Sequence, residues 1–156
     1  MAELKIDRCK REDFSSVVKM WEAWCEETRK KSPHFPVKAG SSWNFQEHLS
    51  NIFLDGKYAL FVAKQDGLVM GFCMGFVEAN TALMEHDKIG KIENFCVNTE
   101  SQEVKQGLFD ALAVWFKAKG VAVMEISIFD PSGDTLKVWS GLGFRFTRAV
   151  CQKPLS

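Results

Sequence analysis

A chain of 156 residues is the length of one globular domain, and its 46 % hydrophobic and 26 % charged residues exclude a disordered or collagen-like chain. Twenty Lys and Arg side chains balance twenty Asp and Glu side chains, so a strongly basic surface is excluded and nucleic acid is disfavoured as a partner. No apolar run approaches the roughly 20 residues of a membrane helix, so we expect no membrane partner either.

The five cysteines are scattered along the chain, and no two have the Cys-x-x-Cys spacing typical of zinc or redox sites. This usage fits a reducing compartment, and we expect a cytoplasmic protein. The adjacent Glu85, His86 and Asp87 come closest to a metal-ligand cluster, but neighbouring side chains point apart, and we expect no metal site. No repeat and no long linker interrupts residues 1–156, which are predicted to form one domain.

The first half of the chain predicts a strand, two helices and a loop between them. Apolar residues alternate in Glu3 to Cys9, which is typical of a short strand, and then recur with helical spacing from Arg11 to about Lys31. A second helix is expected around Phe45 to Phe53. The loop between the helices, Ser32 to Trp43, is rich in proline and aromatic residues and forms either a binding lid or an aromatic-anchored connection.

A hairpin is predicted next, because Asp66-Gly67 separates two apolar runs, Tyr58 to Lys64 and Leu68 to Ala79. Three further strands are expected at Lys88 to Asn98, Val121 to Phe129 (buried on both faces) and Gly143 to Cys151, with a helix before each of the last two. The predicted fold class is therefore α/β of the α+β kind. It has a mixed, mostly antiparallel sheet of about six to seven strands, flanked by about four helices.

Glu93 is the first candidate for chemistry, because a carboxylate within an otherwise apolar strand needs a partner or a task. It is either a general base facing a cleft or the partner of a lysine such as Lys91 or Lys64. A shift of one residue in strand register would put Asn94 in its place.

The order of elements, the helix start bearing Gly107 and the closing turn WSGLGFRF resemble the GNAT N-acetyltransferase superfamily over nearly the whole chain. This resemblance implies a GNAT-like acyl-CoA N-acyltransferase fold with acetyl-CoA as co-substrate. It also implies that the strand segment Phe95, Cys96 and Val97 holds the pantetheine arm through its backbone. The family's tyrosine acid, four residues before the Gly-Phe pair, corresponds to Trp139, which either lines the site or belongs to the core.

The family's phosphate loop corresponds to six positions, of which only Gly107 keeps the family residue: Val104, Lys105, Gln106, Gly107, Leu108 and Phe109. The turn over Lys105 to Leu108 is expected to cradle the pyrophosphate at the helix start. The alternative is a simple helix cap formed by Thr99-x-x-Gln102.

The resemblance implies transfer of an acetyl or other acyl group to a primary amine of a small molecule or peptide. If Glu93 faces the cleft, we expect it to remove the ammonium proton, directly or through a water. Phe35, Trp43 and Phe76 are expected to wall the acceptor side. An acyl-enzyme at Cys96 is disfavoured because no histidine is near it in the sequence. The alternative function is a catalytically weakened GNAT-like domain that binds acyl-CoA or regulates a partner, since indole at Trp139 is no general acid. The sequence leaves a homodimer open.

Overall fold

The computed structural model describes residues 3–129 and 132–155, which form one mixed sheet with helices on both faces. The elements in chain order are β1 (Leu4–Arg8), the short 3-10 helix η1 (Arg11–Asp13), α1 (Phe14–Lys31), α2 (Ser42–Ile52), β2 (Tyr58–Gln65), β3 (Leu68–Ala79), β4 (Lys88–Val97), α3 (Gln102–Ala118), β5 (Met124–Ile126) and α4 (Gly133–Gly141). The mixed, mostly antiparallel α+β fold class is confirmed.

The sheet has the strand order β1-β2-β3-β4-β5, so sequence neighbours are also neighbours in space. The first three pairings are antiparallel, and only β4 and β5 run parallel, joined by the crossover through α3. The predicted hairpin is present between β2 and β3. Asp66 and Gly67 have φ values of 52° and 76° at its turn, the left-handed conformation for which Asp-Gly is favoured.

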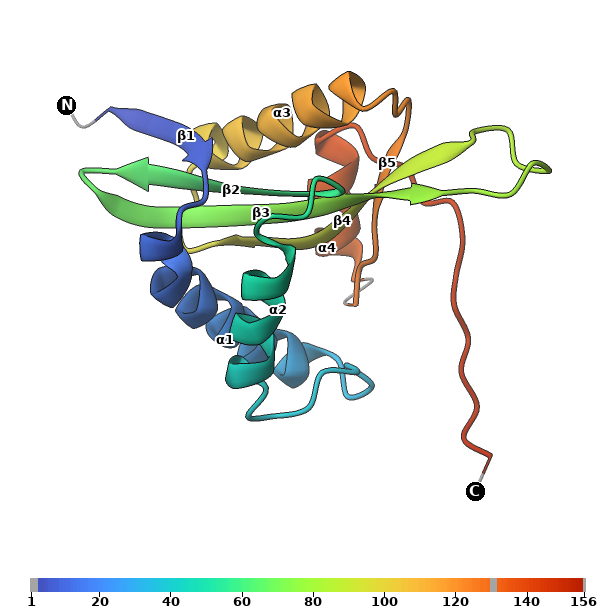
Figure 1. Cartoon of the computed structure of the whole chain (residues 1–156). Helices are drawn as coiled ribbons and strands as arrows, with labels where there is room; N and C mark the ends of the chain where they lie inside the picture. Colours follow the sequence, from blue (N-terminus) through green and yellow to red (C-terminus); the bar gives the residue numbers. More distant parts are fainter. Residues whose placement is uncertain (1–2, 130–131, 156) are drawn as a thin grey trace.

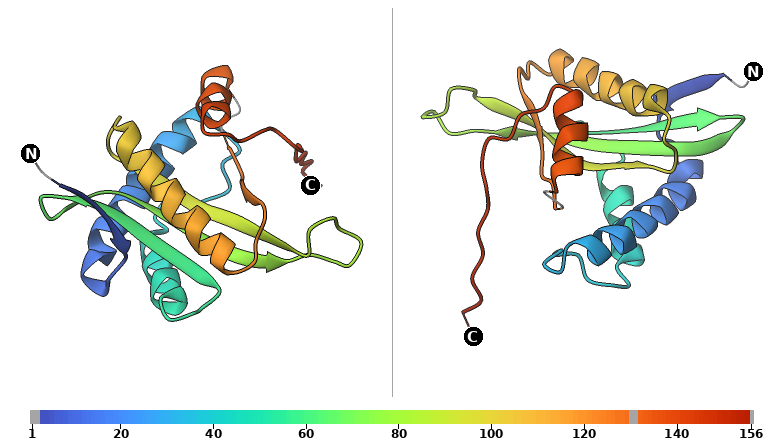
Figure 2. Two further views of the ribbon diagram at one scale, coloured as in Figure 1. Left: turned by 90° about the horizontal axis from the view of Figure 1, so that it is seen from above. Right: turned by 180° about the vertical axis from the view of Figure 1, so that it is seen from behind.

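Two apolar layers hold the helices against the sheet. On one face α1 and α2 contribute Val17 and Leu49 to a core with Phe72 of β3, and on the other α3 contributes Leu108 and Leu112 (Figure 1). Side chains of helix α4 pack in the same layer as α3. The view from behind shows this helix running upright beside β5, across the level of the sheet (Figure 2). Each fully buried side chain of this kind stabilises the fold by about 1.5 to 3 kcal/mol.

Helix α1 ends at Lys31, as predicted. Ser32 adopts an extended conformation with φ −127° and ψ 104°, which is the conformation that the following Pro33 imposes on its predecessor. The Ser32 N–H donates to the Thr28 carbonyl at 2.8 Å and closes the last turn. The helix boundary is thus set by local chemistry.

The sequence predicted too many strands, because the described residues contain five. The strand predicted over Val121 to Phe129 shrinks to the three residues of β5, all of them only half-buried. β5 pairs with β4 alone, so it is an edge strand and not the doubly covered one expected. Among the described residues, no helix is both long and apolar enough to cross a membrane.

The predicted last strand, Gly143 to Cys151, is also wrong. Phe144 still packs in the α3 layer, but from Arg145 onward the described tail is exposed and leaves the domain (Figures 1 and 2). Phe146 is 72 % exposed and Val150 80 % exposed, so the alternating apolar residues that predicted the strand have no core to face.

Candidate active site

A β-bulge in β4 determines where Glu93 lies. Met74 of β3 pairs with Asn94 and the next residue, Gly75, pairs with Ile92, so Glu93 is the extra residue of the bulge. Asn94 lies opposite Met74, whose side chain belongs to the α1/α2 core, and Glu93 reaches α2 on that same face. The two alternatives that the sequence left open therefore share one face of the sheet.

The two residues differ in what can reach them. Asn94 is buried, with 8 % of its surface exposed, whereas a third of the Glu93 side chain is exposed. Only the carboxylate can meet a ligand arriving from solvent. This exposure favours Glu93 as the candidate base.

The partner of Glu93 is a histidine of α2. Nε2 of His48 lies 3.2 Å from one carboxylate oxygen of Glu93 and 3.3 Å from the other. This hydrogen bond raises the pKa of the His48 imidazole above its ordinary value, against the opposing effect of burial. The lysines that the sequence offered as partners are engaged elsewhere, Lys91 with Glu78 and Glu125 and Lys64 with Asp13.

Aromatic rings complete this cluster. The imidazole of His48 meets Tyr58 of β2 edge to face at 6.1 Å, and Tyr58 lies 5.3 Å from the ring of Phe76. Burial and, after it, the negative charge of Glu93 raise the pKa of the Tyr58 hydroxyl. Phe76, expected on the acceptor side, is thereby placed two rings away from the carboxylate.

His48 and Tyr58 are the residues of this cluster that sequence reasoning missed. His48 is 45 residues from Glu93 in the chain, and a single histidine on the polar side of a helix carries no signal of its own. Tyr58 is the only tyrosine, but its position at the start of a hairpin strand says nothing about Glu93. Only the pairing of β2, β3 and β4 brings them together.

The backbone of β4 beyond the bulge is the second part of the candidate site. β5 pairs with β4 only from Gly90 to Ile92, so the two strands part just before Glu93. Within the described residues, no β5 partner faces the following segment, Phe95 to Val97. Strand N–H and C=O groups directed to this side are available to a ligand with amide groups of its own.

Cys96 belongs to the same segment but not to its chemistry. Its side chain is buried against the α1 face, and burial raises the pKa of its thiol well above the ordinary range. A thiol that stays protonated is a poor nucleophile. The geometry therefore agrees with treating Cys96 as packing.

An aromatic cluster lines the α3 side of the gap between β4 and β5. Phe95 stacks on Phe109 at 4.2 Å, and Trp139 of α4 meets their ring edges at 6.0 and 5.6 Å. Phe144 closes the cluster 5.3 Å from Trp139. The structure thus brings together three predicted cofactor residues, Phe95, Phe109 and Trp139. Phe109 is buried, whereas Trp139 is only half-buried.

The remaining predicted cofactor positions lie inside α3. The helix begins at Gln102, capped by the Ser101 hydroxyl and not by Thr99 as expected. The Lys105 N–H already donates to the Ser101 carbonyl at 3.3 Å, so the first free amides belong to Gln102 and Glu103. Pyrophosphate binding by Lys105 to Leu108 stays a prediction that this helix start does not favour.

The side chains of the same six positions serve the fold. Val104 and Leu108 are buried in the α3 layer, and the Lys105 ammonium lies 3.6 Å from Glu100. A Cβ on Gly107 would lie 3.0 Å from Ile6 of β1, so this glycine allows the helix to approach the strand closely. Gln106 donates to Asp110 at 2.8 Å on the helix surface.

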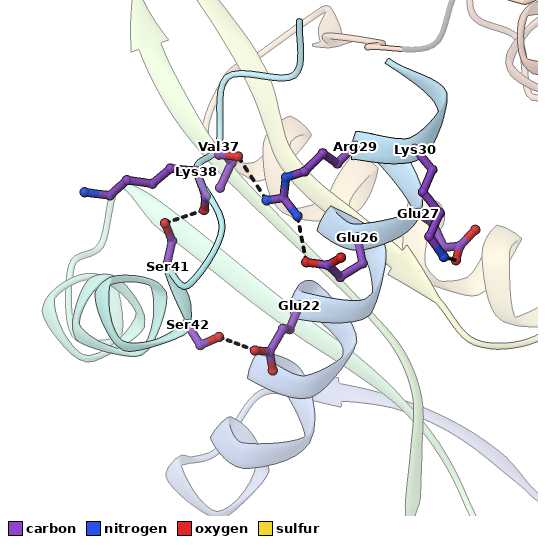
Figure 3. Close-up of polar contacts among 9 residues, drawn as sticks. All are labelled: Glu22, Glu26, Glu27, Arg29, Lys30, Val37, Lys38, Ser41 and Ser42. Carbon is purple, nitrogen blue, oxygen red and sulfur yellow. Dashed lines mark hydrogen bonds and ion pairs between the residues drawn. The ribbon is translucent and has the colours of Figure 1, made fainter. Parts of the chain in front are cut away.

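The loop between α1 and α2 is held down on α1. The Arg29 guanidinium donates to the Val37 carbonyl at 3.0 Å and to Glu26 at 2.6 Å, and Ser42 donates to Glu22 at 2.7 Å (Figure 3). This network anchors the loop at both its middle and its end.

The aromatic residues predicted to wall the acceptor differ in their placement. Phe35 packs between Trp24 of α1 and Phe129, which follows β5, at ring distances of 5.5 and 5.2 Å. The loop therefore bridges α1 and the segment after β5. Trp43 is 74 % exposed and contacts none of the rings around Glu93 in the described structure.

Solved structures share this architecture over nearly its full length. A predicted acetyltransferase with acetyl-CoA from Clostridium acetobutylicum matches with a TM-score of 0.77 and 12 % identity, over 98 % of this chain and 97 % of that one. A GCN5-related N-acetyltransferase from Ralstonia eutropha matches with a TM-score of 0.76 and 16 % identity, over 99 % and 100 %. AAC(6')-Iy in complex with a bisubstrate analog matches with a TM-score of 0.69 and 18 % identity, over 99 % of both chains.

No protein-family model matches the sequence, and no curated protein is a significant relative. The likeness is therefore one of fold alone, over nearly the whole chain. On these grounds the chain has the fold of the GCN5-related N-acetyltransferases, the GNAT superfamily.

Proposed function

We propose that the protein is an N-acyltransferase that moves an acetyl or other acyl group from acetyl-CoA to a primary amine of a small molecule or peptide. The observation that carries this proposal is the position of Glu93. The β-bulge puts its carboxylate at the point where β4 and β5 part, partly exposed on the face of the sheet that α1 and α2 cover. A base is needed there because an amine attacks a thioester only after losing its ammonium proton.

The backbone of Phe95 to Val97 supplies the second requirement. It would hold the pantetheine arm of acetyl-CoA and stabilise the oxyanion through N–H groups, a role that does not depend on side-chain identity. The aromatic cluster around Trp139 would exclude water from the α3 side. No protein acid is required, because a thiol with a pKa near 8.5 can depart as thiolate.

A second candidate function is a GNAT-like domain that binds acyl-CoA weakly or regulates a partner without turnover. The observation that favours it is the start of α3, where Glu100 and Glu103 border the free amides. Carboxylates at a helix N-terminus stabilise the helix but repel the phosphates of CoA. Indole at Trp139 also cannot donate a proton as a tyrosine acid would.

Calorimetric titration with acetyl-CoA, followed by a mass-spectrometric assay of acetyl transfer to a panel of small amines and peptides, distinguishes these functions. Glu93→Gln should lower turnover by about 100-fold or more near neutral pH with little change in acetyl-CoA affinity. Glu85→Gln, an exposed loop residue, is the matched control. Binding without transfer to any amine would support the second function. Absence of binding would contradict both the transferase and the acyl-CoA-binding form of the second function. A homodimer stays a prediction for gel filtration to test.

A further inference from the structure

A second titratable side chain lies against the proposed base. The His48 imidazole contacts both carboxylate oxygens of Glu93 through one nitrogen, and about a third of each side chain is exposed. Each of the two side chains is thus partly in contact with solvent and partly buried in the fold. Such a pair can pass a proton from the site to water.

Packing fixes the imidazole in this position. Leu49, the next residue of α2, is fully buried, and Phe45, one turn earlier, stacks on Trp21 of α1 at 4.2 Å. Tyr58 of β2 meets the ring edge to face, with 6.1 Å between the ring centroids. Three elements therefore determine the contact between His48 and Glu93, unlike a surface ion pair between two flexible side chains.

The charges around the ring are few. Glu93 faces it from β4 and Tyr58 from β2, with Asp55 acting on the Tyr58 hydroxyl. The nearby cation of β4, Lys91, is engaged by Glu78 and Glu125. No described cation therefore competes with the imidazole for the carboxylate of Glu93 at this contact.

We propose that His48 receives the proton that Glu93 removes from the acceptor ammonium, an inference that rests on the proposed function. A Glu93 oxygen takes one proton from the R–NH₃⁺ group, leaving R–NH₂ with a free electron pair and a neutral carboxyl group. At rest the neutral imidazole carries its hydrogen on Nε2 and donates it to the carboxylate. Once Glu93 is protonated, exchange through solvent gives the Nδ1–H tautomer, and Nε2 then takes the proton from the carboxyl group. The carboxylate is restored, and the imidazolium loses a proton to solvent.

The chemical reason for the second group is the gap between the ordinary pKa values of an amine and a carboxylate. A lysine-like ammonium has a pKa of about 10.4 and a glutamic acid about 4.3, so a carboxylate alone holds the amine's proton poorly. An imidazole, with an ordinary pKa near 6.5, narrows this gap by about two units. Returning Glu93 to its charged form also prepares it for the second proton that the nitrogen loses on acylation.

The test compares His48→Gln with His86→Gln, the same substitution in the loop between β3 and β4. Glutamine keeps a hydrogen-bond donor for Glu93 but cannot carry the proton. We expect His48→Gln to lower kcat by about 10-fold or more near neutral pH, with the KM for acetyl-CoA unchanged. The acidic limb of the pH profile should move to lower pH, because only the carboxylate then titrates. His86→Gln should match the wild type.

A measurement independent of turnover follows the imidazole by NMR titration in the wild type and in Glu93→Gln. The midpoint of His48 should fall in Glu93→Gln, since the carboxylate that holds its proton is gone. An unchanged titration midpoint of His48, or a His48→Gln enzyme with the wild-type rate and pH profile, would overturn the role of His48 but not the proposed function. A wild type that acetylates no amine would instead overturn the proposed function on which it rests.

Discussion

The carboxylate of Asp13 lies 2.7 Å from the ammonium of Lys64, and this ion pair ties the start of α1 to β2. Asp13 is buried, and its other carboxylate oxygen accepts the Lys10 N–H at 2.9 Å. Its hydrogen bond also raises the pKa of Lys64. One buried side chain therefore fixes both the turn before the helix and the strand beneath it.

Asp13→Ala should lower the free energy of unfolding by about 3 kcal/mol, because it leaves Lys64 with no buried partner and frees the Lys10 N–H. Glu12→Ala, at the exposed neighbouring residue, is the control and should change stability by less than about 0.5 kcal/mol. Urea denaturation measures both. Equal stability of the two variants would show that the ion pair contributes nothing net.

Gly75→Ala should destabilise the protein by about 1 to 3 kcal/mol. A Cβ at this position would lie 2.8 Å from the Phe116 ring and 3.0 Å from the Lys91 carbonyl, on the strand next to the bulge. Gly56→Ala is the matched control, since nothing lies within 4 Å of its Cβ. Thermal unfolding of the two variants checks this expectation. A Gly75→Ala protein as stable as the control would show that the backbone near the bulge shifts to accommodate the added methyl group.

The pair of His48 and Glu93 makes stability depend on pH. Its hydrogen bond raises the folded pKa of His48 above the ordinary 6.5, so the folded state binds this proton more tightly than the unfolded chain. The stabilisation is complete below the ordinary value and is lost as pH rises through the raised one. The free energy of unfolding of the wild type should therefore exceed that of His48→Gln, and the difference should be larger at about pH 5.5 than at about pH 9. A difference that does not change with pH would exclude this linkage.

Trp139 should report acyl-CoA binding. It lies half-buried on Phe95 and Phe109 beside the gap where the pantetheine arm is proposed to bind. In protein labelled with 5-fluorotryptophan, acetyl-CoA should shift the fluorine resonance assigned through Trp139→Phe. The resonance of Trp24, on the opposite face of the sheet, should stay in place. If the chemical shift of Trp139 does not change at saturating acetyl-CoA, this indole belongs to the core and not to the binding site.

Local chemistry made much of the fold predictable. Asp66-Gly67 specified the hairpin turn and Pro33 the end of α1, because each acts through its own backbone. The strand at Gly143 to Cys151 failed for the opposite reason. Its alternation is local, but a strand also needs a neighbour, and the described part of β5 offers only three residues.

The candidate site shows the same division. Glu93 was detectable because a carboxylate in an apolar strand is unusual within its own segment. Its partner was not, because His48 becomes significant only when α2 lies across β4. The start of α3 was not predictable for a related reason: the hydroxyl of Ser101 caps the helix where Thr99 was expected to, and this two-residue difference decides which amides are free.

The brief parallel contact between β4 and β5 has a consequence for local unfolding. Three residue pairs join the two strands, and no residue of β5 is fully buried. By contrast, β2 is paired with β3 along its whole length, and both strands carry fully buried side chains. The free energy of opening between β4 and β5 is therefore lower than between β2 and β3. Amide protons of Met124 to Ile126 should exchange with solvent through sub-global openings, while those in the middle of β3 should require global unfolding. The contact between β4 and β5 lies beside the proposed acyl-CoA site, so a bound ligand that bridges the two strands would slow exchange there first.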